Sequence, residues 1–286
     1  MAEPRYRDGW YVVPDGLRLH YRDYVGSAER PPLVCLPGLT RNARDFEAFA
    51  ERYSPRFRVL AVDFRGRSLS DRDPQPLRYN PLTYVGDVLQ LLDQLIISRA
   101  IFVGTSLGGI VTMLVAASAP RRIAGAILND VGPELSERGL ERIRGYVGEG
   151  VFAGWDEAAR ALAANNRNVP AAFTHDDWVK MARRTCREAD GEVTFDYDPA
   201  IAVPFAAVAA APAVDMWPLF HALAQHPLLA LRGAVSDLLS AEAFARMEET
   251  VPSASFVVVP GVGHAPMLDE PEGIAAIDAF LDAVAP

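Results

Sequence analysis

The chain has few cysteines, no long uninterrupted apolar run and no concentration of positive charge. Only Cys35 and Cys186 occur among its 286 residues, far apart and without a C-x-x-C pair or a histidine cluster. This pattern indicates neither a disulfide framework nor a zinc site. We expect two free thiols, no metal and no cofactor.

Membrane and nucleic-acid partners are also disfavoured. The formal net charge is −9 and no Lys/Arg run is long enough to bind phosphates, so neither nucleic acid nor an anionic membrane surface is expected as a partner. The most apolar stretch, residues 200–214, contains two prolines and is shorter than the ~20 residues of a spanning helix. Charged residues among the first ten leave no room for the apolar stretch of a signal peptide, so we expect a cytoplasmic location.

What is present is an ordinary globular composition, with 50% hydrophobic and 23% charged residues. Short Val/Ile/Leu-rich runs alternate with segments of helical periodicity. Strands are predicted at residues 32–36, 58–62, 100–104, 124–129, 228–231 and 256–259, and helices at 84–95, 108–119 and 272–284. This alternation predicts an α/β fold with a mostly parallel central sheet flanked by helices.

The alternation stops in the middle of the chain. Between about residues 131 and 219 no strong strand pattern occurs, and helical windows cover residues 155–165 and 176–189. We interpret this segment as an inserted helical cap. The predicted organisation is therefore a core in two parts, residues 1–130 and 220–286, around a cap at 131–219.

The strongest chemical motif is G-x-S-x-G at residues 104–108, placed between a predicted strand and a predicted helix. Glycines permit a tight turn there, and the serine hydroxyl projects at the edge of the sheet. Ser106 is the candidate nucleophile. The alternative is a glycine-rich helix start that holds an anion or nothing.

A serine nucleophile needs a base, and the base needs an orienting acid. His264 follows the last strand on a loop that ends on the same side of the sheet as Ser106, so it is the candidate base. Asp237, just past the strand at 228–231, is the preferred acid, and the order Ser106, Asp237, His264 fits this architecture. Asp130, just past another strand, is the rival.

Attack on a carbonyl also requires donors for the oxyanion, which we assign to two backbone amides. One is the N–H of Leu107, next to the nucleophile. The other is the N–H of Leu39 in the Pro37-Gly38-Leu39 turn after the first parallel strand, where an ordinary tight turn is the alternative.

At these residues the sequence resembles the α/β-hydrolase fold superfamily over nearly its whole length. Residues 62–70 resemble that family's D-x-R-G-x-G-x-S segment, and residues 261–264 resemble its G-x-G-H ending. Two positions depart from the pattern. Pro37 stands where the family usually has a histidine that shapes the oxyanion loop, and Ser68 replaces a glycine.

The resemblance, together with a serine nucleophile, narrows the expected reactions. Haloalkane dehalogenases and epoxide hydrolases carry Asp where Ser106 stands, so these two activities are disfavoured. The preferred interpretation is a cofactor-free serine hydrolase that cleaves a carboxylic ester or lactone of a small, partly apolar molecule through an acyl-enzyme. The alternatives are a carbon–carbon bond hydrolase of aromatic ring-cleavage products and a non-catalytic or slow ligand-binding sensor. The oligomeric state stays open.

Substrate preference is expected to depend on the cap and the neighbouring loops. Aromatic residues gather in and beside the cap, and Trp155 and Trp217 are candidate substrate-binding residues, although packing of the cap explains such aromatics equally well. Five arginines lie on or near two loops at the active-site side: Arg41, Arg44, Arg65, Arg67 and Arg72. They are candidates for binding a substrate carboxylate, Arg41 and Arg44 first among them, against the alternative of a solvated basic rim.

Overall fold

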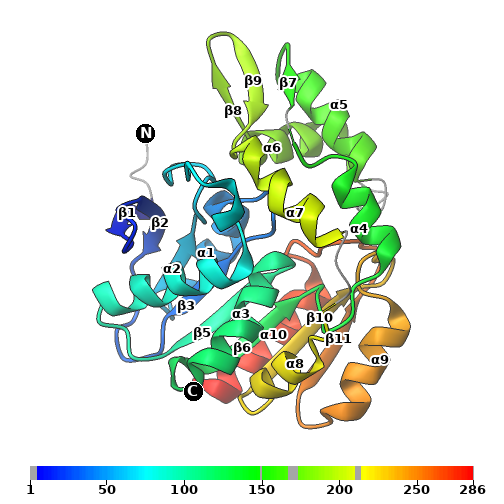
Figure 1. The fold of residues 1–286 in the computed structure, drawn as a ribbon. Helices are drawn as coiled ribbons and strands as arrows, with labels where there is room; N and C mark the ends of the chain where they lie inside the picture. The colour runs from blue at the N-terminus through cyan, green and yellow to red at the C-terminus, as the bar shows by residue number, and fades with distance from the viewer. Residues whose placement is uncertain (1–4, 149, 167–172, 210–213, 286) are drawn as a thin grey trace.

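A computed structural model describes residues 5–148, 150–166, 173–209 and 214–285. An eight-stranded sheet in the order β1-β2-β4-β3-β5-β6-β10-β11 forms its centre (Figure 1). Strands β1 and β2 pair antiparallel with their neighbours, whereas β4, β3, β5, β6, β10 and β11 run parallel to one another. The strands are β1 (Arg7–Val12), β2 (Arg18–Tyr24), β3 (Leu33–Leu36), β4 (Val59–Val62), β5 (Ala100–Thr105), β6 (Ile123–Asn129), β10 (Leu228–Gly233) and β11 (Ser255–Val259). The predicted α/β class is confirmed.

The inner parallel strands β3, β4, β5, β6 and β10 are buried on both faces, which explains why they read as continuous apolar runs, whereas the edge strand β11 is only partly buried. In β5, Ala100 and Phe102 join one apolar cluster while Ile101 and Val103 join the other. Each of the six predicted strands occurs within two residues of its predicted bounds.

Helices cover both faces of the sheet. The first cluster contains residues of α2 (Pro81–Gln94), α3 (Leu107–Ser118), α8 (Trp217–Leu223) and α9 (Ala241–Thr250), and the second contains residues of α1 (Glu47–Tyr53) and α10 (Pro271–Val284). Helix starts follow the usual signals: the Asn80 side chain accepts the Thr83 N–H at 3.1 Å, and Pro81 and Pro271 open their helices.

The insertion between β6 and α8 lies over the ends of the strands (Figure 1). Its elements are α4 (Glu137–Arg144), β7 (Val151–Phe152), α5 (Trp155–Asn165), α6 (His175–Thr185), β8 (Cys186–Ala189), β9 (Glu192–Phe195) and α7 (Ala202–Ala209). Helices α5 and α6 share a separate apolar cluster with Cys186 and Val193. This segment therefore has packing of its own.

The insertion is not purely helical, which corrects the sequence-based expectation. Helix α6 ends at Thr185, and the rest of the window predicted as helix forms β8, part of the three-stranded antiparallel sheet β7-β9-β8. Asp190 and Gly191, both with positive φ, join β8 to β9. Asp-Gly is a strong signal for a two-residue hairpin turn, so the signal was present in the sequence.

The predicted boundary at residue 219 falls inside α8, which packs against α3 of the core. Residues 210–213 of the apolar stretch at 200–214 lie outside the described residues, and α7 covers part of the remainder. Within the described ranges, no helix is both long and apolar enough to cross a membrane.

Candidate active site

Ser106 lies at the turn between β5 and α3 with φ 52° and ψ −116°, a strained conformation for a residue with a side chain. Close backbone packing creates this turn. A Cβ on Gly108 would lie 2.0 Å from the Leu36 carbonyl oxygen, and one on Gly104 would lie 2.6 Å from the Gly108 backbone. The glycines of the motif therefore allow the start of α3 to lie directly against β3 and β5.

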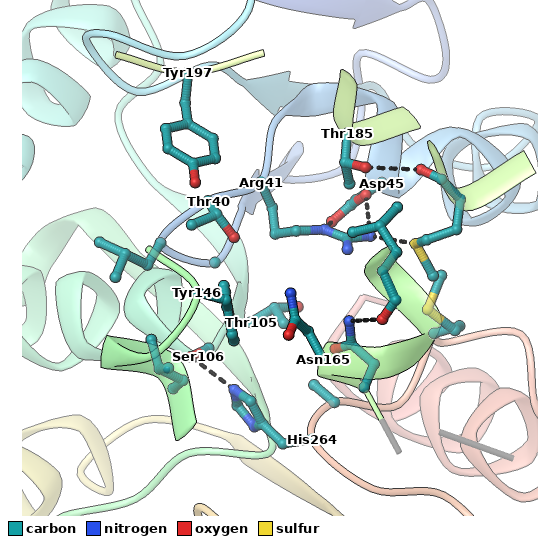
Figure 2. A pocket seen from close by; sticks show the side chains of 18 of the residues that line it. Thr40, Arg41, Asp45, Thr105, Ser106, Tyr146, Asn165, Thr185, Tyr197 and His264 are labelled. Carbon is teal, nitrogen blue, oxygen red and sulfur yellow. Dashed lines mark hydrogen bonds and ion pairs between the residues drawn. The ribbon is translucent and has the colours of Figure 1, made fainter. Parts of the chain in front are cut away.

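Ser106, His264 and Asp130 form one hydrogen-bonded chain. The Nε2 atom of His264 lies 3.0 Å from Ser106 Oγ, a contact drawn in Figure 2, and its Nδ1 lies 2.7 Å from Asp130 Oδ2. Because an ionised carboxylate only accepts, Nδ1 carries the proton in the neutral ring and Nε2 accepts from the serine hydroxyl. The imidazole is thus oriented to remove the proton of Ser106.

Asp130 is fully buried directly after β6, and neutral groups fix its carboxylate. The Gly233 N–H donates to Oδ1 at 2.8 Å, and the Ser236 hydroxyl donates to Oδ2 at 2.6 Å. Ser236 also accepts the N–H groups of Leu238 and Leu239, so its oxygen is held by the loop that follows β10. The carboxylate therefore has little freedom to leave His264.

The predicted pairing of His264 with Asp237 is wrong. Asp237 accepts two hydrogen bonds from Arg142 of α4, at 2.5 Å from Nε and 2.9 Å from Nη2. Helix α4 packs tightly here, since a Cβ on Gly139 would lie 2.7 Å from the Asp237 carbonyl oxygen. Burial opposes ionisation of Asp237, but the hydrogen bonds and charge of Arg142, together with smaller contributions from the charge of His264 and from a backbone hydrogen bond, outweigh it and hold the pKa of this carboxyl below its ordinary value.

The sequence contained a signal for Asp130. This residue follows β6 without a gap, whereas Asp237 lies four residues beyond the end of β10. Sequence reasoning missed Ser236, and it also missed Asn129, whose Nδ2 donates to Thr105 Oγ1 at 3.1 Å and to the Pro266 carbonyl at 2.8 Å. Asn129 thereby ties the loop of His264 to the ends of β5 and β6.

The two candidate oxyanion amides belong to adjoining segments. A Cβ on Gly38 would lie 3.7 Å from Ser106 Cβ, so the turn that carries Leu39 passes beside the nucleophile, and Leu107 follows Ser106 directly. Within the described parts of the chain, neither the Leu39 N–H nor the Leu107 N–H has a hydrogen-bond acceptor. Both amides are available to a substrate oxygen.

A cavity of about 120 Å³ opens at Ser106 and His264 between the core and the insertion. Figure 2 shows these two side chains in the lower part of the view and Arg41 with Asp45 above them. The insertion contributes mixed apolar and polar side chains to the lining: Ile143, Tyr146, Leu162, Asn165, Asn166, Met181, Thr185, Phe195 and Tyr197. Burial raises the pKa of Tyr146, so its hydroxyl stays neutral.

Of the candidate substrate-binding residues, only Arg41 lines this cavity. Its Nε and Nη2 atoms donate to Asp45 at 2.5 and 2.7 Å, so its charge is already balanced. Arg44 instead joins the core to the insertion through Asp196 at 2.5 Å and the Arg184 carbonyl at 2.8 Å. Its predicted role at a substrate carboxylate is therefore not supported.

Neither candidate tryptophan belongs to the lining of the cavity. Trp155 donates to Glu188 at 3.0 Å and packs beneath Arg183, while Trp217 donates to Glu134 at 2.9 Å and packs on Phe220. Both thus serve packing, which was the alternative explanation.

The two cysteines are buried and unpaired, and burial raises the pKa of both thiols. They are correspondingly unreactive. Among the described residues, no group of three or more His, Cys, Asp or Glu side chains is arranged to hold a metal ion.

Comparison with known proteins agrees with this architecture. Residues 33–277 match the model of the alpha/beta hydrolase family. An alpha/beta hydrolase from Novosphingobium aromaticivorans, solved by crystallography, shares 51% identity with a TM-score of 0.93 over 98% of this chain and 99% of its own. A 3-hydroxybutyrate-oligomer hydrolase of Cupriavidus necator is 34% identical over 98% of each chain, and a 2-(acetamidomethylene)succinate hydrolase of Mesorhizobium japonicum is 30% identical over 88% of each.

The chain belongs to the alpha/beta hydrolase family. The two relatives from Cupriavidus necator and Mesorhizobium japonicum are hydrolases, and they support a general hydrolase role for this protein.

Proposed function

We propose that the protein is a serine hydrolase in which Ser106 attacks a carbonyl carbon, His264 serves as general base and Asp130 orients the imidazole. The observation that carries this proposal is the continuous hydrogen-bonded chain from Asp130 through His264 to Ser106. In the first step Ser106 Oγ bonds to the carbonyl carbon while its proton passes to His264 Nε2. The protonated ring then gives this proton to the leaving oxygen, and an acyl-enzyme remains.

Water completes the cycle by the reverse proton transfers. His264 removes a proton from water, the resulting hydroxide attacks the acyl carbon, and the ring returns the proton to Ser106 as the acid leaves. The amides of Leu39 and Leu107 are the proposed donors to the oxyanion in both halves of the reaction. Their lack of other acceptors in the described residues supports this assignment.

The proposed substrate is a carboxylic ester or lactone of a small, partly apolar molecule. The cavity is small, and its lining combines side chains such as Leu162 and Phe195 with the hydroxyls and amides of Tyr146 and Asn165. Arg41 and Asp45 balance each other in charge, which favours a neutral acyl group next to them. A short ester of a hydroxy acid fits these features, and the 34% identity to the 3-hydroxybutyrate-oligomer hydrolase makes such oligomers the first substrates to test.

The test compares the wild-type protein with Ser106→Ala in labelling by a fluorophosphonate and in hydrolysis of p-nitrophenyl butyrate and 3-hydroxybutyrate dimer. We expect Ser106→Ala to lose labelling and to lose kcat by a factor on the order of 10⁶, because the hydrogen-bonded set acts as a unit. Ser118→Ala is the matched control, since Ser118 is exposed at the far end of α3 and should leave both readouts unchanged.

Turnover by folded Ser106→Ala would contradict the nucleophile assignment. Rapid cleavage of a ring-cleavage dienoate with poor cleavage of all esters would replace ester hydrolysis by carbon–carbon bond hydrolysis. If the wild-type protein is neither labelled nor active, the alternative of a ligand-binding protein without catalysis would replace the proposed function.

A further inference from the structure

Arg67 is fully buried after β4, and its guanidinium group faces the oxyanion turn. Its Nε and Nη2 atoms both donate to the Leu39 carbonyl oxygen, at 3.1 and 3.0 Å. Its Nη1 donates to the Arg65 carbonyl at 2.7 Å and to the Tyr84 hydroxyl at 2.9 Å. Every one of these acceptors is a neutral oxygen.

The neighbouring Arg65 shows how unusual this charge is. Arg65 is equally buried but lies between the carboxylates of Asp87, Asp73 and Asp15. In the described part of the chain, no carboxylate lies within 4.0 Å of the Arg67 guanidinium. A buried cation without a counter-charge is costly, so Arg67 contributes less to stability than a paired arginine would.

The proposed reaction creates a negative charge at the oxyanion turn, which this cation contacts. Arg67 contacts Leu39, whose N–H is a proposed oxyanion donor, and the turn lacks the histidine that usually shapes it in this family because Pro37 stands there. Two donors on this carbonyl oxygen fix the Leu39–Thr40 peptide group. The Leu39 N–H belongs to the preceding peptide group, so Arg67 restrains it indirectly, by limiting the rotation of the Leu39 backbone between the two groups. A fixed positive charge behind that turn also favours the developing oxyanion in a buried site.

We propose that Arg67 is a positioning residue that holds Leu39 in place for the oxyanion and that contributes its charge to the transition state. The inference rests on the proposed serine-hydrolase function.

A purely structural role of Arg67 predicts a different result. The backbone of Arg67 forms a bridge with Tyr197, and its guanidinium lies near the rings of Tyr79 and Tyr84. The backbone bridge does not depend on the side chain, and loss of the ring contacts would lower stability without selective loss of oxyanion binding.

The experiment uses two variants. Arg67→Met removes both the hydrogen-bond donors and the charge, whereas Arg67→Lys keeps the charge but cannot donate two parallel hydrogen bonds to the Leu39 carbonyl. We measure kcat and KM for p-nitrophenyl butyrate and the inhibition constant of butylboronic acid, which forms a tetrahedral adduct with a catalytic serine. We expect Arg67→Met to lower kcat about 10²- to 10³-fold, the cost of losing one oxyanion donor, with KM changed less than threefold. The kcat of Arg67→Lys should lie between the kcat of the wild-type protein and that of Arg67→Met.

Boronate affinity should decrease by the same factor as kcat/KM, because both report binding of a tetrahedral oxyanion. Arg122→Met is the matched control: Arg122 also donates to a backbone carbonyl, that of Ile97 at 2.8 Å, on a different part of the core. It should leave boronate affinity unchanged. Tyr84→Phe removes one acceptor of Arg67 and provides a milder variant if Arg67→Met does not fold.

Unchanged boronate affinity in folded Arg67 variants, or a loss confined to KM, would overturn the proposal. If the wild-type protein reacts with fluorophosphonate and hydrolyses esters, and the Arg67 variants have the same kcat and boronate affinity, only the proposed role of Arg67 is wrong and the proposed function stands. If the wild-type protein does neither, the proposed function fails and this inference fails with it.

Discussion

Asp130 and Asp237 follow neighbouring strands of one sheet, yet their surroundings give them different chemistry. Both are nearly inaccessible, with side chains 0% and 5% exposed. Asp237 is neutralised by Arg142, whereas within the described residues His264 is the basic side chain within 4.0 Å of Asp130. A carboxylate already paired with a guanidinium gains little from a second cation. The interaction of Asp130 with His264 becomes stronger when the imidazole is protonated. The partners of Asp130 therefore suit it to stabilise the charged imidazole that forms in the transition state.

Among the variants that test this comparison, the largest expected effect separates the two acids. Asp130→Asn should lower kcat about 10⁴-fold, because an asparagine at this position favours the wrong imidazole tautomer and cannot balance its positive charge. Asp237→Asn should lower kcat less than tenfold. Steady-state hydrolysis of p-nitrophenyl butyrate measures both variants, with folding checked by circular dichroism. The opposite ranking would return the catalytic acid to the loop after β10.

A smaller effect is expected from the group that holds Asp130. Ser236→Ala removes the hydroxyl that donates to Asp130 Oδ2 at 2.6 Å. This hydrogen bond exists in the ground state as well as in the transition state. It affects kcat only to the extent that it is stronger in the transition state, so we expect about a tenfold decrease in kcat. Ser240→Ala is the matched control, since that serine caps α9 instead. Equal losses of kcat in the two variants would show that Ser236 does not act through Asp130.

The parallel core could be predicted because its inner strands are buried on both faces and prolines mark the starts of helices such as α2 and α10. The nucleophile and base positions follow from local sequence around Ser106 and His264. The choice of acid does not, because the sequence shows which loops end at one edge of the sheet but not which carboxylate an arginine occupies. Arg142 lies 95 residues from Asp237 in the chain, and no local pattern announces their pairing. The sequence placed Arg67 among the arginines near the active-site loops, but its contact with Leu39, 28 residues away, could not be predicted from it.

A third paired carboxylate, Asp45, allows the comparison to be extended to specificity. Asp45→Asn would leave Arg41 as an unbalanced cation beside the cavity, at 22% exposure. We expect kcat/KM for mono-p-nitrophenyl succinate to rise about three- to tenfold relative to p-nitrophenyl butyrate, since a partly exposed charge contributes about 1 kcal/mol or slightly more. High salt should reduce the gain. Asp278→Asn, which unpairs Arg52 elsewhere on the surface, is the control. An equal change for both esters would exclude charge recognition at Arg41.

The smallest effect concerns stability and its dependence on pH. Arg142 holds the pKa of Asp237 below its ordinary value, so the pair stabilises the folded state fully above the unfolded pKa of about 3.9 and loses this contribution as the pH falls through the lower folded value. At pH 7, Asp237→Asn should lower the free energy of unfolding by about 1–2 kcal/mol, less than for a fully buried pair because Arg142 is 23% exposed.

Urea titrations measure this difference in unfolding free energy between the wild-type protein and Asp237→Asn. It should be the same at pH 5 and smaller at pH 3. In an Arg142→Met background the Asp237→Asn difference should shrink at pH 7. A difference that persists unchanged at pH 3 would mean that Asp237 acts through packing rather than through its charge, and the contrast with Asp130 would then rest on geometry alone.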